Sequence, residues 1–332
     1  MAMMANPIAA RLTTKTVQHL AKATATTAVT TAVSNRIVTN IRTSSAARIH
    51  NRPIHSESTT SSVKLLLRDL RELDTSSLCD AHKTITTGRT DDDGRDAVQI
   101  KLMNSTIRPM NQPNRFGTGT QDVMVGVART VAFTEPDDFL PVMRALALEA
   151  KADEVLVVNT LSSKRAVAGE IFAAEARRKG LAGIVIDGPV RDTAYLDGTS
   201  DGCGHGEASA GGDGIPASVA PVAMRIYSTG TTPYSGTTQS PGEMQPSVVT
   251  CGGIEVRPGD IVVGDNDGVI VGAPEAFFEL VPVAQTIQRI EQELVEGITT
   301  VGRSQSLASM TNLENHVRDR LEGKPSNLEF RT

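Results

Sequence analysis

The chain has 332 residues and a formal net charge of −5; 39% of its residues are hydrophobic, only 3% are aromatic, and tryptophan is absent. A core must therefore rest on Val, Ile, Leu and Ala, the usual filling of an α/β domain with a Val/Ile-rich sheet. No apolar run reaches the roughly 18–20 residues that a membrane-spanning helix needs, so we expect no membrane segment. The acidic balance also argues against a nucleic-acid partner, because the body of the protein would repel phosphate.

The first 56 residues differ in composition from the rest of the chain. They contain seven Lys or Arg and fourteen Ser or Thr, and the first acidic residue is Glu57. A basic, Ser-rich and acid-free start is typical of an organellar transit peptide. We therefore expect residues 1–60 to be a disordered targeting extension, addressed to the mitochondrion or plastid. The alternative is a basic tail without a specific partner, on a cytoplasmic protein.

The first regular elements follow this extension. Leucines recur at helical intervals over residues 63–73, and Asp74 and the hydroxyl residues after it offer N-caps for a second helix. Residues 87–96 are polar and contain glycine, which is typical of a loop. An alternating, β-branched stretch at 123–133 predicts a strand, and residues 136–151 predict a helix with a proline near its start.

Residues 154–186 have the pattern of a βαβ unit. The short apolar runs EVLVVN (154–159) and LAGIVI (181–186) are typical of buried strands. Between them, residues 169–179 predict a helix with an acid in its first turn and three cations in its last, closed by Gly180. This spacing predicts a right-handed crossover between two parallel strands.

The C-terminal half begins with a long irregular region. Residues 199–250 are rich in Gly, Ser, Thr and Pro, so we interpret them as an irregular excursion, with 229–245 as a surface insertion. After it, the pattern predicts short strands at 253–256, 260–263 and 268–271, with a tight turn at Asp267-Gly268, and a helix from 274 to about 296. One domain would thus occupy residues 61–300, and 301–332 would form a polar tail.

The βαβ unit also predicts where chemistry lies. The carboxyl ends of parallel strands share one edge, so the helix start at residues 169–172 should lie near Arg191 and Asp192. Its free N–H groups would hold an anion, and Arg191 adds a forked cation suited to a carboxylate. Asp192 and Glu170 offer hard oxygen ligands for Mg²⁺ or Mn²⁺, which could polarise the keto oxygen of a 2-oxo acid.

Each of these features also has a simpler interpretation. Arg191-Asp192 could be a surface ion pair, Glu170 a first-turn acid, and Gly169 only an N-cap. Two other patterns favour structure over chemistry. GDNDG (264–268) fits a hairpin turn better than a calcium loop, and Cys203 with His205 lacks the further ligands of a zinc site. The three cysteines, which include Cys79 and Cys251, form no CxxC pair and predict no disulfide framework.

Two long motifs resemble one known family. AGEIFAAEARRKGLAGIVIDGPVRD (168–192) and GGIEVRPGDIVVGDNDGVIV (252–271) are similar to the two signatures of the RraA-like / 4-hydroxy-4-methyl-2-oxoglutarate aldolase family, in the same order. The resemblance covers roughly residues 63–300. It implies an αββα sandwich with swivelling β/β/α topology, assembled into homotrimers or hexamers, and no nucleic-acid or membrane partner.

The resemblance also implies an activity and a role for each site residue. The family includes class II pyruvate aldolases that cleave 4-hydroxy-4-methyl-2-oxoglutarate and decarboxylate oxaloacetate to pyruvate. Here the backbone amides of Gly169, Glu170, Ile171 and Phe172 would bind the carboxylate of a small 2-oxo acid, and Arg191 would bind the substrate and stabilise the enolate. Asp192 would hold Mg²⁺ or Mn²⁺, partly through water. A neighbouring subunit would add a further acid.

One departure from the family leaves a second function open. Aldolase members often have an acid three residues after the Asp of the Arg-Asp pair, where this chain has Tyr195. Within the family, loss of that acid accompanies weak lyases and a regulatory branch that binds and inhibits an RNA-degrading endonuclease. The alternative to a lyase is therefore a non-catalytic regulator of a ribonuclease or another partner protein.

Overall fold

The computed structural model describes residues 56–86, 99–110, 123–193, 196, 225–244, 248–300 and 305–329. Most of the expected targeting extension lies outside these residues, as do Tyr195, Cys203 and His205. Within the described residues no helix is long and apolar enough to cross a membrane.

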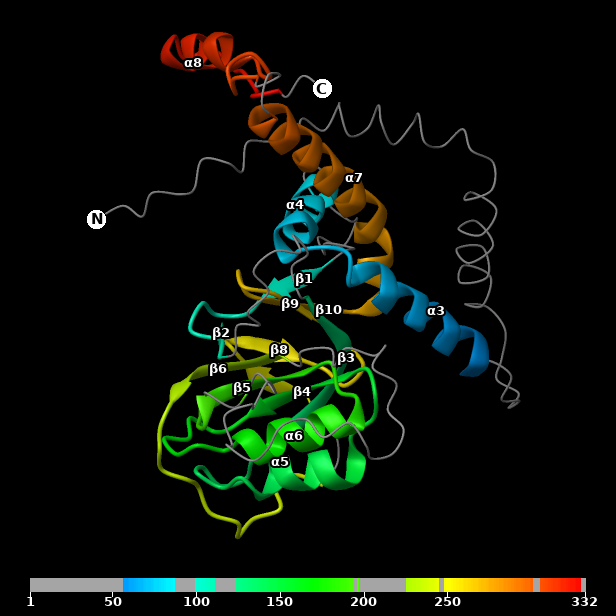
Figure 1. The fold of residues 1–332 in the computed structure, drawn as a ribbon, viewed down its shortest axis with the longest axis vertical. Helices are drawn as coiled ribbons and strands as arrows, with labels where there is room; N and C mark the ends of the chain where they lie inside the picture. Colours follow the sequence, from blue (N-terminus) through cyan, green and yellow to red (C-terminus); the bar gives the residue numbers. More distant parts are fainter. Residues whose placement is uncertain are drawn as a thin grey trace, which may run out of the picture.

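A mixed eight-stranded sheet forms the centre of the protein, in the order β1-β10-β9-β3-β4-β5-β6-β2 (Figure 1). The four strands β3, β4, β5 and β6 pair in parallel, and the outer strands pair antiparallel. Their bounds are Ile100–Leu102 (β1), Arg108–Pro109 (β2), Met124–Ala132 (β3), Glu154–Asn159 (β4), Gly183–Val190 (β5), Arg225–Thr231 (β6), Ile261–Gly264 (β9) and Val269–Gly272 (β10). A separate hairpin joins β7 (Val249–Cys251) to β8 (Ile254–Val256).

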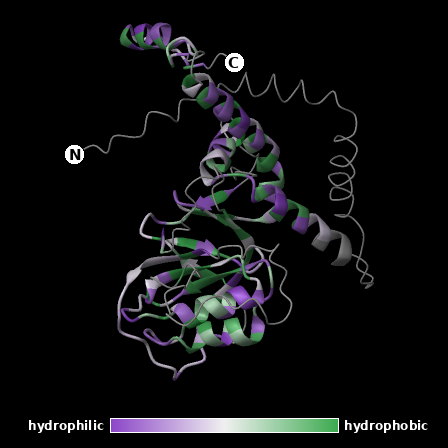
Figure 2. Ribbon diagram, in the orientation of Figure 1, coloured by the Kyte–Doolittle hydropathy of each residue, from purple (hydrophilic) through white to green (hydrophobic). Residues whose placement is uncertain are grey.

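Helices cover this sheet in two groups (Figure 1). The first comprises α5 (Leu140–Arg144), the π-turn η2 (Ala145–Glu149) and α6 (Glu170–Lys179). The second comprises α3 (Ser56–Leu70), α4 (Thr75–Thr86) and α7 (Pro274–Thr299). The chain is thus a mixed α/β domain, as predicted. Figure 2 shows that its hydrophobic residues follow the strands and the helix faces that meet them.

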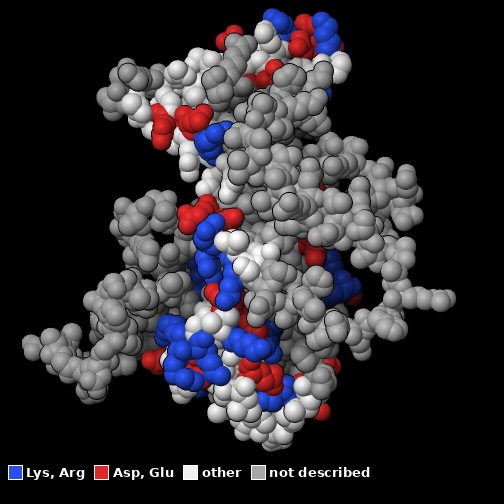
Figure 3. Space-filling view, turned by 90° about the vertical axis from the view of Figure 1, so that its right-hand side faces the viewer, with Lys and Arg blue, Asp and Glu red and all other residues white. Residues whose placement is uncertain are grey.

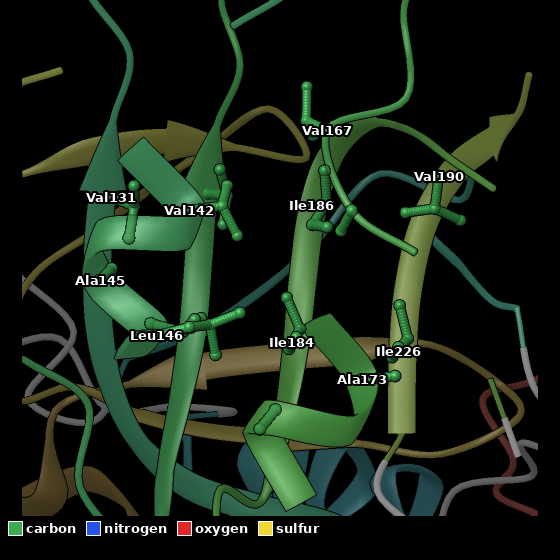
Figure 4. Close-up of a cluster of buried hydrophobic side chains, with 14 of the residues drawn as sticks. Val131, Val142, Ala145, Leu146, Val167, Ala173, Ile184, Ile186, Val190 and Ile226 are labelled. Atoms are coloured by element: carbon green, nitrogen blue, oxygen red, sulfur yellow. The ribbon is translucent and has the colours of Figure 1, made fainter. Parts of the chain in front are cut away.

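The aliphatic core meets the expectation from composition. Figure 4 shows Val131, Ile184, Ile186 and Ile226 on the sheet facing Val142, Leu146 and Ala173 on the helices. These seven side chains are at most 3% exposed. A second cluster packs α3, α4 and α7 against β9 and β10, with Phe277 fully buried. Small and aliphatic side chains therefore form these two clusters without tryptophan.

The predicted βαβ unit is present. Strand β4 spans residues 154–159 as predicted and pairs in parallel with β5. Helix α6 begins after Gly169, and Gly180 closes it in the left-handed conformation with φ 74°. The helix therefore starts at the edge where β4 and β5 have their carboxyl ends.

Two predicted segments need correction. The helix expected over 136–151 begins only at Leu140, and its second half is a π-turn. Just before it, the buried Asp138 carboxylate accepts the Leu140 N–H at 2.9 Å. The excursion expected over 199–250 includes a core strand. Residues 225–231 are β6, which pairs with β5, and its first four residues are buried. Glycines and hydroxyl residues in the second half of β6 concealed it.

The C-terminal part of the chain extends away from the sheet. Helix α7 has 26 residues and continues past the sheet to α8 (Leu313–Leu321), which lies at the far end of the molecule in Figure 1. No residue of α8 is buried. The polar tail expected from the sequence thus contains a short helix.

Charged side chains are mixed on the face that Figure 3 presents. Lys and Arg gather over its lower half, with Asp and Glu set among them. Among the ion pairs of the described residues, Arg129 Nε of β3 lies 2.6 Å from Glu154 Oε2, and Arg144 Nε of α5 lies 3.0 Å from Glu149 Oε1. The charges of these two arginines are therefore locally neutralised.

Candidate functional site

Two segments far apart in the sequence meet at the carboxyl edge of β4 and β5. Val167 donates its N–H to the Pro189 carbonyl at 3.2 Å, and Arg191 donates its N–H to the Ala168 carbonyl at 3.0 Å. These bonds hold the approach to α6 beside the end of β5. Arg191 and Asp192 consequently lie next to the first turn of α6, as the βαβ geometry predicts.

The Asp192 carboxylate folds back onto the start of α6. Asp192 has φ 58°, a left-handed conformation that Asp tolerates better than most residues. Its Oδ2 lies 3.4 Å from the Glu170 N and 3.3 Å from the Arg191 Nε. The acid thus sits between the positive end of a helix and a guanidinium.

Glycine is required at position 169 because the Asp192 and Arg191 side chains approach its backbone closely. A Cβ at this position would lie 2.5 Å from Asp192 Oδ2 and 3.0 Å from Arg191 Cγ. Any side chain here would displace both functional groups. The absence of a Cβ therefore creates the space in which the Arg-Asp pair meets the helix.

The first-turn amides are not equally free. The Glu170 N–H faces Asp192, and the Phe172 N–H bonds to the Gly169 carbonyl at 3.0 Å. Among the described residues, no acceptor is assigned to the N–H groups of Gly169 and Ile171. Of the four predicted amides, these two are the ones available to an added anion.

A small pocket of about 100 Å³ opens at this point. Its walls comprise Phe139, Ala166, Val167, Ala168, Gly169, Ile171, Phe172, Arg191, Asp192 and Ser235. Phe139 and Phe172 meet edge to face, with ring centroids 5.8 Å apart, and form the apolar side. Arg191 and Asp192 form the polar side, with 39% and 37% of their side chains exposed.

Sequence reasoning missed two of these walls. Phe139 precedes α5, and Ser235 belongs to the segment after β6 that we interpreted as a surface insertion. Backbone bonds bring this segment to the site: Ala166 donates to the Tyr234 carbonyl at 2.8 Å, and Thr237 donates to the Asp137 carbonyl at 2.7 Å. Such contacts join residues about 70 and 100 positions apart, and no local pattern signals them.

The polar side suits a hard divalent cation that keeps most of its water. Asp192 supplies a carboxylate to the pocket, and Glu170, whose backbone N–H faces Asp192, is not among the residues of the pocket wall. Within the described residues no group of three or more His, Cys, Asp or Glu side chains surrounds this or any other point. Mg²⁺ is commonly held by one or two carboxylates, with water and substrate completing its shell. The donor set therefore fits such an ion better than zinc.

Thiol chemistry has no support at the site. Burial, and then the charges of Asp80, Asp265 and Asp74, raise the pKa of the Cys79 thiol to about 11. Burial also raises the pKa of Cys251 far above its usual range. Both thiols stay protonated at neutral pH, and neither residue lines the pocket.

Comparison with known proteins shows the family of the chain. A family model described as "RraA-like: Aldolase/RraA" matches residues 75–204 and 217–271, which is more than half of the chain. The chain belongs to the RraA-like family. Its site segment, 168–192, lies inside the matched region.

The relatives of this RraA-like protein include bacterial and archaeal sequences. One, from Halalkalibacterium halodurans, carries the provisional name 4-hydroxy-4-methyl-2-oxoglutarate aldolase and is 33% identical over 170 residues, which cover 51% of this chain and 65% of that protein. An uncharacterized protein of Methanocaldococcus jannaschii is 33% identical over 158 residues, covering 48% and 63%. The chain thus spans just under two thirds of the length of these curated relatives.

Solved structures of similar fold include two bacterial proteins. An uncharacterized protein from Pseudomonas syringae pv. tomato has 22% identity and a TM-score of 0.49, over 72% of this chain and 94% of that one. RraAS2 of Streptomyces coelicolor, described as an unusual member of the RNase ES inhibitor RraA protein family, has 23% identity and a TM-score of 0.48, over 74% and 98%.

Proposed function

We propose that this RraA-like protein is a divalent-metal-dependent lyase that forms pyruvate from 2-oxo acids. It would cleave substrates of the 4-hydroxy-4-methyl-2-oxoglutarate type, decarboxylate oxaloacetate, or do both. The observation that carries the proposal is the meeting of Arg191, Asp192 and the α6 N-terminus around the side-chain-free Gly169.

Each group would have one task at the substrate. The N–H groups of Gly169 and Ile171, which are free among the described residues, would hold the carboxylate next to the keto group. Arg191 would donate to the keto oxygen and remain bonded as that oxygen gains charge on the way to the enolate. Phe139 and Phe172 would exclude water from one side of the reacting carbons, which strengthens these interactions.

Asp192 would hold Mg²⁺ or Mn²⁺, with Glu170 nearby and water completing the coordination. When bound, the ion would supply charge stabilisation at the keto oxygen. Asp192 is also the group that turns Arg191 toward the pocket, through the 3.3 Å contact of its Oδ2 with Nε.

A coupled pyruvate assay tests the proposal. The purified protein is incubated with oxaloacetate, and then with 4-hydroxy-4-methyl-2-oxoglutarate, above a metal-only background. We expect activity that EDTA abolishes and that Arg191→Ala lowers by at least about 10²-fold, because the developing charge loses its guanidinium. Arg178→Ala is the matched control, since Arg178 pairs with Glu175 on the outer side of α6. Full activity in Arg191→Ala would refute the assignment.

A regulatory role is the second candidate, because Tyr195 stands where aldolase members often have an acid. No pyruvate from either substrate, together with a copurifying protein partner that survives Arg191→Ala, would favour it. The assembly is proposed to be a homotrimer or hexamer, which light scattering would measure. We also propose that residues 1–60 direct the chain to a mitochondrion or plastid; a fusion of these residues to a fluorescent protein that stayed in the cytoplasm would exclude this.

A further inference from the structure

The loop between β4 and α6 carries two cations, and the second, Arg165, lies at the rim of the pocket. Lys164 and Arg165 are both exposed, and no ion pair among the described residues includes either of them. The Arg165 Nη1 lies 3.4 Å from the backbone carbonyl of Ser235, a weak bond to a residue of the pocket wall. Arg165 therefore places a guanidinium beside the pocket, and no carboxylate of the described residues forms an ion pair with it.

The backbone beneath Arg165 is firmly held. Asp137 Oδ1 accepts the N–H of Lys164 at 2.6 Å and that of Arg165 at 2.8 Å. The next residue, Ala166, donates its N–H to the Tyr234 carbonyl at 2.8 Å and accepts the Gly236 N–H at 3.1 Å. Because the root of the side chain is fixed, less entropy is lost when its guanidinium binds a ligand.

The chain enters this loop through two strained residues. Leu161 and Ser162 have φ of 53° and 61°, the left-handed region that residues other than glycine rarely adopt. Two such residues in succession persist only where the surroundings determine them, and such strain gathers at functional sites. Here the strain lies directly before the segment that presents Lys164 and Arg165.

The nearby acids already have partners. Asp137 Oδ1 is occupied by the two backbone N–H groups, and Asp192 lies against Arg191 and the start of α6. Among the described residues, no acid forms an ion pair with Arg165. A ligand carboxylate could therefore form a charge-assisted hydrogen bond with Arg165 without displacing an acid of the described residues.

The size of the pocket shows what such a ligand must look like. Its volume is about 100 Å³, so we expect it to take the 2-oxo acid end of a substrate and to leave the rest of the substrate outside. Ala166 and Ser235 belong to the pocket wall, and the Arg165 guanidinium bonds to the Ser235 carbonyl. A substrate that extends past these two residues would therefore meet a cation.

We propose that Arg165 binds the distal carboxylate of a dicarboxylic 2-oxo acid, and so makes the site selective for dianionic over monoanionic substrates. The inference rests on the proposed function for the position of the 2-oxo acid end. It adds a residue that acts on specificity, away from the reacting bond. Lys164 adds general attraction for anions at the same rim.

A pair of unreactive ligands tests the proposal by direct binding. Calorimetry with Mg²⁺ present compares 2-oxoglutarate, which has a distal carboxylate, with 2-oxobutanoate, which does not. We expect tighter binding of 2-oxoglutarate, and Arg165→Ala should weaken that binding about tenfold while leaving 2-oxobutanoate unchanged. Arg165→Lys should restore part of the difference, added salt should narrow it, and Arg178→Ala should leave it intact.

The outcomes separate this inference from the proposed function. Equal binding of the two ligands by the native protein, or an equal loss of both in Arg165→Ala, would overturn the role of Arg165. If the native protein forms pyruvate but Arg165→Ala keeps the same preference for dicarboxylates, the lyase proposal is supported and the role of Arg165 is refuted. If no pyruvate forms and 2-oxoglutarate still binds in an Arg165-dependent manner, the role of Arg165 is supported and the lyase proposal is refuted.

Discussion

Replacing Gly169 by alanine gives the sharpest test of the site, because the structure sets the size of the perturbation. The added Cβ would lie 2.5 Å from Asp192 Oδ2, whereas ordinary contact begins at 3.4 Å. The carboxylate must therefore move by about 0.9 Å, and the Arg191 side chain with it. Misplacement by about 1 Å can cost a reaction about 10²-fold, or about 2.7 kcal/mol of activation free energy.

The fold should tolerate this change. The atoms in conflict belong to partly exposed side chains that can rotate away. We therefore expect the free energy of unfolding of Gly169→Ala to differ from that of the native protein by no more than about 1 kcal/mol, close to the cost of a poorer N-cap. The assay is kcat/KM for pyruvate formation, with urea unfolding as the companion measurement. Gly268→Ala is the control, because its Cβ would meet only Leu102 Cδ1, at 3.5 Å. Unchanged kcat/KM in a folded Gly169→Ala variant would refute the proposed arrangement.

Two further predictions concern buried carboxylates. Asp265 is fully buried and accepts the Thr75 N–H and hydroxyl, each at 2.8 Å, so Asp265→Ala should destabilise the protein by about 2–4 kcal/mol in urea unfolding. As a control, replacement of the exposed Asp267 by alanine should change the free energy of unfolding by less than about 0.5 kcal/mol. Equal effects of the two substitutions would contradict this account. Burial favours the neutral form of Asp138, but hydrogen bonds, led by that from the Ser240 N–H, outweigh it and lower the pKa. The stabilisation from Asp138 is therefore full above its unfolded pKa, about 3.9, and is lost as pH falls through the lower folded value. Asp138→Asn should flatten the pH dependence of stability in this acid range, and an unchanged profile would exclude the effect.

Local pattern was sufficient to predict the βαβ unit and the position of the Arg-Asp pair. Residues 154–159, 169–180 and 181–186 each carry their own signal: an apolar run, a helix with matched end charges and a closing glycine. The parallel pairing of the two strands then required Arg191 to lie beside the helix start. The rule that parallel strands have their carboxyl ends at one edge of the sheet thus predicts this long-range contact from local patterns.

Other parts of the site depend on contacts that a local pattern does not record. Asp138, two residues before the start of α5, is bonded to Thr237, Gln239 and Ser240, about 100 positions away. Ser235 lines the pocket because its neighbours pair with residue 166 and with Asp137. The polar composition of this segment predicted exposure, and most of it is exposed; its backbone bonds nevertheless make it a wall of the site.

The position of Asp192 bears on how substrate and metal would bind. In this structure the Asp192 carboxylate takes up the positive potential of the α6 N-terminus that a substrate carboxylate would use. Two carboxylates at one helix start repel each other, and a divalent cation between them would turn repulsion into attraction. The 2-oxo acid and the metal should therefore bind cooperatively, each raising the affinity of the other by the same factor.

This coupling can be measured without turnover. Binding of 2-oxobutanoate is titrated with and without Mg²⁺, and Mg²⁺ binding with and without 2-oxobutanoate; we expect affinity to rise about tenfold in both directions. Asp192→Asn removes the repulsion and weakens the metal ligand, so 2-oxobutanoate should bind the metal-free variant more tightly than the native protein, and the coupling should largely disappear. If the native protein binds 2-oxobutanoate equally with and without Mg²⁺, the two ligands do not meet at Asp192, and the carboxylate serves only to cap α6.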